Sequence, residues 1–135
     1  MAMVFELHPG GRRCTIRLTG TITYSDIDGG IREQIAAGAW QAETVIDAAR
    51  AEAIATGFDD SRRVVRTLHN LSGVLPPRGP VVIVVGDNSA IYGMARQYEQ
   101  VLASENVHQR VAIIRSGDDV DAAFAQLGAS SQGPE

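Results

Sequence analysis

Five consecutive β-branched residues, from Val81 to Val85, constrain this chain more than any other feature of its sequence. A run of valine and isoleucine without a polar interruption indicates a strand that is covered on both faces. Such strands lie inside parallel sheets, which carry helices on both sides. The length of 135 residues and the hydrophobic content of 44% fit one domain with its own core. We therefore expect an α/β domain built around this segment.

Strand and helix patterns alternate on both sides of this segment. Further strands are predicted over residues 3–8, 14–20, 44–48 and 111–114, where apolar residues alternate or run together. The first two flank the turn Pro9-Gly10-Gly11, which predicts an antiparallel hairpin. Helices are expected after Ser25, with Asp28 three positions on, and after the capping segments 59–61, 86–89 and 116–119. The order β-β-α-β-α-β-α-β-α predicts a mixed, mostly parallel five-stranded sheet whose first strand is the antiparallel edge.

Residues 44–55 give two conflicting signals. Thr44–Ala48 reads as a buried strand, whereas residues 48–55 are rich in alanine, arginine and glutamate, which favour helix. We predict the strand, because every later helix needs a sheet to pack on. The domain is expected to span residues 1–127, and residues 128–135 are expected to form a flexible tail.

Composition excludes several classes of chemistry. All twelve basic residues are arginine, which excludes a Schiff-base lysine and the Gly-Lys pair of a P-loop. Cys14 is the one cysteine, so no intrachain disulfide is expected, and a single thiol fits a reducing cytoplasm. The segment Met1–His8 is too short and charged for a signal peptide, and no apolar run reaches a membrane span of about 20 residues. With a formal net charge of −4, no nucleic-acid partner is expected. Because there is one cysteine and the three histidines are scattered, no metal is expected, and no cofactor either.

The last third of the chain carries a family resemblance. Its matching segments are 81–87, a valine-rich strand ending in Gly86-Asp87, then 91–99, 110–115 and 119–127. With these segments the chain resembles the SpoIIAA-like branch of the STAS-fold family, the domain of bacterial anti-sigma-factor antagonists. The resemblance implies the same element order and a non-enzymatic module that binds proteins, or a small apolar or acidic ligand.

The family's regulatory serine has only a weak counterpart here. STAS switches phosphorylate a serine at the start of the second helix, in an Asp-Ser-Ser-Gly-like motif. Counting nine positions from Asp47 reaches Thr56, while Ala55 replaces the acidic residue of the motif. Asp59 and Asp60 already charge this helix start, so a phosphate would change little there. We expect the surface around Thr56, Phe58 and Ser61 to bind a partner constitutively.

Two aspartates and one tyrosine complete the candidate binding residues. Asp47 and Asp87 are expected at the carboxyl ends of parallel strands, the edge where open α/β sheets bind ligands. Ordinary helix capping is the favoured reading of both, ahead of a magnesium or acid–base role. Cys14 is predicted to be a core thiol rather than a nucleophile. Tyr92 is predicted to face outward, as an interface aromatic.

Three functions therefore remain open. The first is a cytoplasmic, non-enzymatic STAS-like interaction module, which a closed core would favour. The second is a protein that binds a small apolar ligand or lipid, which an apolar cavity above about 300 Å³ would favour. The third is an enzyme that uses Asp47 and Asp87, which a polar cleft joining the two would favour. A homodimer is expected, through an edge strand or the helix face of Tyr92.

Overall fold

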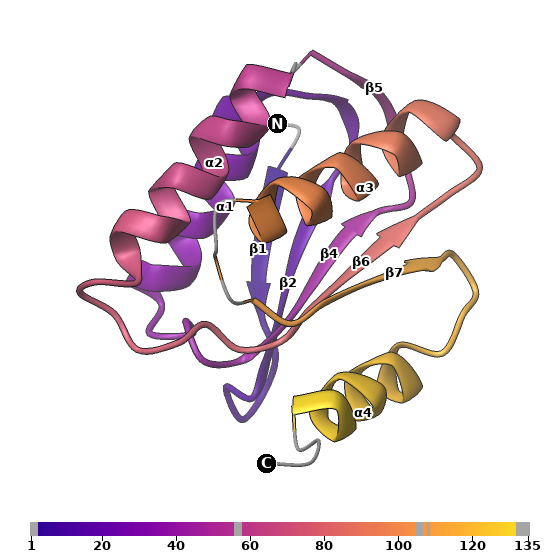
Figure 1. The fold of residues 1–135 in the computed structure, drawn as a ribbon. Helices are drawn as coiled ribbons and strands as arrows, with labels where there is room; N and C mark the ends of the chain where they lie inside the picture. The colour runs from indigo at the N-terminus through magenta and orange to yellow at the C-terminus, as the bar shows by residue number, and fades with distance from the viewer. Residues whose placement is uncertain (1–2, 56–57, 105–106, 108, 132–135) are drawn as a thin grey trace.

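The computed structural model describes residues 3–55, 58–104, 107 and 109–131, with a five-stranded sheet between helices (Figure 1). In spatial order the strands are β1 (Met3–Leu7), β2 (Arg13–Leu18), β4 (Glu43–Ala48), β6 (Val81–Val85) and β7 (Val111–Arg115). The helices are α1 (Tyr24–Ala36), α2 (Phe58–Leu71), α3 (Ser89–Ser104) and α4 (Val120–Ser131). This mixed α/β architecture confirms the predicted fold class.

The pairing of the strands also follows the prediction. β1 is an edge strand and pairs antiparallel with β2, whereas β2–β4, β4–β6 and β6–β7 are parallel. β6 lies between two neighbours, and Val81 and Val82 have no exposed surface. The unbroken apolar sequence of this strand is explained by its cover on both faces.

A second, smaller sheet was not predicted. β3 (Gly20–Ile22) and β5 (Ala51–Ile54) pair in parallel, and the Ala55 amide donates to the Ile22 carbonyl at 2.8 Å. The sequence of β5 is Ala-Glu-Ala-Ile, which by itself favours helix. Pairing with β3 overrides that preference, because strand propensity depends on tertiary context.

The start of α1 differs from the prediction. α1 is capped by Thr23, whose hydroxyl accepts from the Asp26 amide while the Asp26 carboxylate accepts from the Thr23 amide. Ser25 and Asp28, the predicted pair, lie inside the helix. The cap is two residues earlier because only Thr23 has its side chain and backbone in the capping geometry.

The remaining helix ends are closer to expectation. α2 begins at Phe58, so the predicted capping residues 59–61 lie in its first turn. The Asn88 carboxamide accepts from two amides at the start of α3, and the Asp119 carboxylate accepts from the Ala122 amide of α4. Both confirm the predicted capping segments. α4 continues beyond residue 127 to Ser131 and therefore includes the first residues of the expected tail. The domain boundary at residue 127 stays a prediction.

The two faces of the sheet have different cover (Figure 1). α1 and α3 pack on one face, and α2 packs on these two helices. Of the described helices, only α4 covers the other face, where Val45 of β4 and Val82 of β6 pack with Ala123 and Phe124. In the described part of the chain no helix is both long and apolar enough to cross a membrane. The helices therefore divide the interior into a three-helix side and an α4 side.

Candidate functional site

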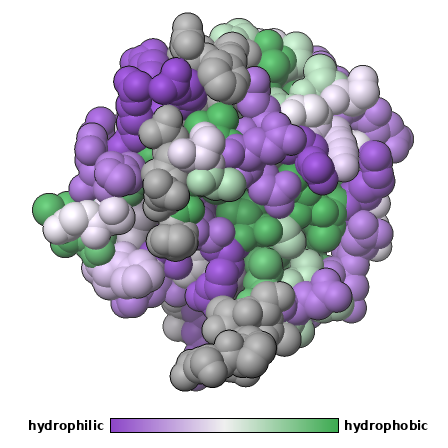
Figure 2. All heavy atoms as spheres, viewed as in Figure 1, coloured by the Kyte–Doolittle hydropathy of each residue, from purple (hydrophilic) through white to green (hydrophobic). Residues whose placement is uncertain are grey.

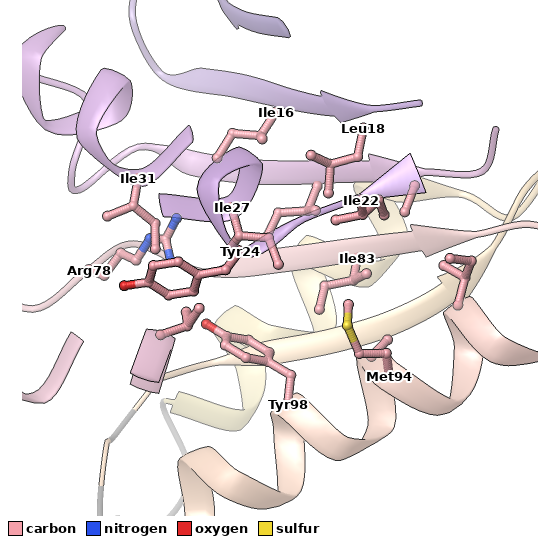
Figure 3. A pocket seen from close by; sticks show the side chains of 15 residues that line it. Ile16, Leu18, Ile22, Tyr24, Ile27, Ile31, Arg78, Ile83, Met94 and Tyr98 are labelled. Atoms are coloured by element: carbon pink, nitrogen blue, oxygen red, sulfur yellow. The ribbon is translucent and has the colours of Figure 1, made fainter. Parts of the chain in front are cut away.

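An apolar pocket lies between the sheet and helices α1 and α3 (Figure 3). Its volume is about 70 Å³. Side chains come from β2, β3, β4, β6, from all three covering helices and from the loop before β6. The lining residues are Ile16, Leu18, Ile22, Tyr24, Ile27, Ile31, Ile46, Ala48, Val64, Arg78, Ile83, Ile91, Met94, Ala95 and Tyr98.

The approach of α1 to β2 fixes one wall of the pocket. A methyl group built on Gly30 would lie 2.8 Å from Ile16 Cγ2, so only glycine allows the helix to come this close. On Gly29 a methyl group would meet only the flexible end of Met3, at 3.3 Å. Two glycines cost a helix about 1 kcal/mol each relative to alanine. For Gly30 the packing against Ile16 gives the physical reason for that cost.

Arg78 is the one charged residue among those that line the pocket, and it sits on the proline-rich loop before β6. The loop is fastened to Trp40: its indole N–H donates to the Pro76 carbonyl at 2.9 Å, and the Gly79 amide donates to the Trp40 carbonyl at 3.0 Å. The guanidinium carbon lies 4.9 Å from the centre of the Trp40 ring. Arg78 is therefore held in place by contacts on both sides of it in the sequence.

The guanidinium of Arg78 has few polar partners. Its Nη2 donates to Gln34 Oε1 at 2.6 Å, and Gln34 itself has no exposed surface. Its Nε is buried without a hydrogen-bond partner. Among the residues that the structure describes, no carboxylate lies within ion-pair distance of it. Burial lowers the pKa of Arg78, and Tyr98 and Cys14 oppose this more weakly.

Tyr98 lies at the same end of the pocket as Arg78 (Figure 3). Its hydroxyl donates to Gln109 Oε1 at 3.2 Å. Burial raises the pKa of Tyr98, with Arg78 as an opposing influence, so the phenol stays neutral. The Gln109 carboxamide nitrogen is also buried without a partner. Two buried donors, Arg78 Nε and Gln109 Nε2, thus lack an acceptor around one tyrosine.

A buried polar network supports Arg78 from behind. The Gln34 carboxamide donates to the Ala39 carbonyl at 2.8 Å and to Thr44 Oγ1 at 2.9 Å. Cys14 is fully buried, and its thiol donates to the same Thr44 oxygen at 3.7 Å. Burial raises the pKa of the Cys14 thiol, with Thr44 and Arg78 opposing. The prediction of a core thiol is confirmed, because a neutral buried thiol is not a nucleophile.

The structure does not bring Asp47 and Asp87 into one cleft. Asp47 Oδ2 lies 3.6 Å from Arg17 Nε, and its Oδ1 accepts from the Ala49 amide at 3.1 Å. A polar hollow there is lined by Arg17, Leu18, Asp47 and Arg50, whereas Asp87 is exposed after β6 and is not part of it. Among the described residues no group of three acidic, histidine or cysteine side chains is placed to hold a metal. The carboxylate of Asp47 is therefore engaged in an ion pair with Arg17 and in a turn with Ala49.

The other predicted site residues have different outcomes. Thr56 lies outside the described residues, and so do the side chains of Phe58 and Ser61, so that surface stays a prediction. Tyr92 was expected to face outward, but it is half-buried against the core. The guanidinium carbon of Arg115 lies 5.0 Å from the centre of its ring. Neither Arg78 nor Gln34 was predicted from the sequence as a site residue.

Comparisons with known proteins give one structural similarity. No family model matches the sequence, and no curated protein matches it. The structure is similar to that of the anti-sigma factor antagonist SpoIIAA in its unphosphorylated form, over 98% of this chain and 100% of that chain. The sequence identity is 14% and the TM-score is 0.47.

Proposed function

We propose that this protein is a non-enzymatic binding module that holds a small, largely apolar molecule in the pocket between the sheet, α1 and α3. The observation that carries the proposal is the lining: all of its residues are aliphatic or methionine except Tyr24, Arg78 and Tyr98. An apolar cavity that stays dry readily binds small apolar molecules. Among the three functions left open by the sequence, the apolar lining favours ligand binding, for a molecule smaller than a cavity of about 300 Å³ would hold.

The size of the pocket limits the ligand. At about 70 Å³ it is well below the 300 Å³ or so of a typical ligand site. A water needs about 10–15 Å³ of such space, so the pocket encloses about five to seven heavy atoms, which is the size of a chain of about six carbons. A short alkyl chain fits this description, and a full-length lipid does not.

The chemistry of the lining supports binding rather than catalysis. The 15 lining residues include no carboxylate, imidazole or thiol. General acid–base catalysis depends on a group that exchanges a proton near the working pH. Burial keeps the Tyr98 phenol protonated by raising its pKa. The lining is therefore suited to hold a molecule and not to transform it.

Calorimetric titration with hexanol tests this proposal. Ala95 is buried on α3 and lines the pocket, so Ala95→Leu fills the space. Ala122→Leu makes the same change on the exposed side of α4 and serves as the control. Hexanol is expected to bind the unchanged protein and Ala122→Leu equally, and Ala95→Leu at least tenfold more weakly. Equal binding by all three proteins, or no binding by any, contradicts the proposal.

A second candidate function, protein contact, is favoured by the β7 edge of the sheet. Figure 2 shows apolar residues gathered over β7, between α3 and α4. Val111, Ala112, Ile113 and Ile114 are each half-buried there, and Arg115 at the strand end contacts Tyr92. An edge strand with apolar side chains is a template for pairing with another chain. We propose that two copies of the protein meet along this edge.

Light scattering over a concentration series tests the dimer. Tyr92→Ala should raise the dimer dissociation constant, since aromatic side chains dominate contact energies. Val4→Ala, on the opposite edge strand β1, should leave it unchanged. A monomer at high micromolar concentration of the unchanged protein refutes this second candidate.

A further inference from the structure

We propose that the ligand of the apolar pocket carries a carboxylate at one end, and that the guanidinium of Arg78 binds this carboxylate. The inference rests on the proposed function, since it identifies the chemical class of the molecule held there. The juxtaposition behind it is a half-buried arginine, whose buried Nε lacks an acceptor, at one end of an otherwise apolar pocket.

The pocket is polar at one end only. Figure 3 shows Arg78 and the hydroxyl groups of Tyr24 and Tyr98 at one end. Ile22 and Met94 lie toward the other end. A molecule that fits such a pocket has an apolar chain and a single polar head.

The charge at that end is not balanced within the described protein. Burying an ion is costly, and proteins pair a buried arginine with a carboxylate or satisfy all its donors with carbonyl groups. Arg78 instead has only neutral partners, which are Gln34 Oε1, the Tyr98 hydroxyl and the face of Trp40. Its Nε is buried and has no acceptor. The group that completes the site must therefore be an acceptor, and a negative charge also offsets the guanidinium.

Gln109 offers a second donor that lacks an acceptor. Its carboxamide nitrogen is buried and unpartnered, while its oxygen accepts from the Tyr98 hydroxyl. Tyr98 lines the pocket, so the Gln109 nitrogen is separated from the pocket by the Tyr98 side chain. A carboxylate has two oxygens and accepts several hydrogen bonds, whereas an alcohol or an ether satisfies fewer donors. An excess of donors with no acceptor favours the carboxylate among polar head groups.

A purely structural role explains Arg78 less well. Trp40 is bonded to the loop through its indole N–H and its carbonyl, neither of which involves the guanidinium. Gln34 is likewise held by Ala39 and Thr44. Arg78 does satisfy the buried Gln34 Oε1, but its own Nε gains no acceptor from these contacts, and a bound anion would supply one. With the pocket's small volume, the matching class is a short-chain monocarboxylate.

The test compares hexanoate with hexanol, which share the apolar chain and differ in the head group. Arg78→Gln removes the charge, and Arg66→Gln removes an exposed arginine of α2 as a control for net charge. The unchanged protein and Arg66→Gln are expected to bind hexanoate about tenfold or more tightly than hexanol. Arg78→Gln is expected to lose that preference and to keep its affinity for hexanol. If Arg78→Gln does not fold, Arg78→Lys provides a second variant, which retains a positive charge at this position.

The outcomes separate this inference from the proposed function. Equal binding of hexanoate and hexanol by the unchanged protein overturns the carboxylate and leaves the apolar site standing. A preference for hexanoate that survives in Arg78→Gln overturns the role of Arg78. If neither compound binds, the proposed function itself fails, and the inference fails with it.

Discussion

The two sides of the central sheet are built from the same strands, yet in the described part of the chain the apolar pocket lies on the three-helix side and the polar hollow beside Asp47 on the α4 side. β4 and β6 present aliphatic side chains to both sides. On the α4 side, Val45, Val82, Ala123 and Phe124 pack into one cluster. On the three-helix side, about 70 Å³ remains between the sheet, α1 and α3. Because both sides share these strands, the covering helices, and not the composition of the strands, decide where the apolar cavity forms.

Local contacts explain the closure of the α4 side. The guanidinium carbon of Arg13 lies 4.8 Å from the centre of the Phe124 ring, and its Nη2 is 2.7 Å from Asp121 Oδ1 and 2.8 Å from Glu43 Oε1. These ion pairs tie the helix to the ends of β2 and β4. On the other side, Gly30 sets how close α1 comes to β2, and Arg78 and Tyr98 occupy one end of the space between the helices. Large side chains hold the walls apart there.

The largest expected effect is on the unfolding free energy, and it compares a covered with an uncovered position on the α4 side. Val82 is fully buried, so Val82→Asp places an unpaired charge in the core and should cost several kcal/mol of unfolding free energy. Val4 faces the same side of the sheet but is 52% exposed, and Val4→Asp should stay within about 0.5 kcal/mol. Chemical denaturation measures both. Cooperative folding of Val82→Asp at unchanged stability would remove the assignment of β6 as an interior strand.

A smaller effect distinguishes the two glycines of α1. Gly30→Ala puts a methyl group against Ile16 Cγ2 and should lower the unfolding free energy by about 1–2 kcal/mol, despite the better helix propensity of alanine. Gly29→Ala meets only the mobile end of Met3, so it should be neutral or gain up to about 1 kcal/mol. Thermal and urea unfolding of the two variants provide the measurement. The same sign for both variants would mean that α1 does not approach β2 this closely.

The smallest effect compares the same substitution on the two sides. Ala123→Leu adds volume to the closed cluster and should destabilise by about 1 kcal/mol or more. Ala95→Leu adds the same volume next to the pocket, so its cost should be close to zero. The difference between the two midpoints of urea unfolding is the quantity of interest. An equal penalty at both positions would indicate that the three-helix side is as tightly packed as the α4 side.

Much of the fold could be predicted from local patterns. The run Val81–Val85 matches β6 residue for residue, because an unbroken β-branched segment leaves few alternatives. The short strands β3 and β5 could not be predicted in the same way. β3 has three residues, and β5 consists mainly of helix-favouring residues that become extended only through their mutual pairing.

The pocket could not be predicted from local sequence patterns. Arg78 stands among prolines and glycines, a context in which an arginine is normally solvated. Its burial depends on Trp40 and Gln34, which are 38 and 44 positions away in the sequence by difference of residue number. One signal was present: Gln34 follows Ile27 and Ile31 on the apolar side of α1, where a polar residue needs a buried partner.

A titration with hexanol followed through methyl NMR signals tests the central claim most directly. Met94 and Ile83 line the pocket, while Val45 belongs to the closed cluster under α4. We expect the Met94 and Ile83 methyl signals to shift saturably and together, with the Val45 signals unchanged. Shifts of equal size on both sides of the sheet, or no shift of the Met94 and Ile83 methyl signals at millimolar hexanol, would contradict the account.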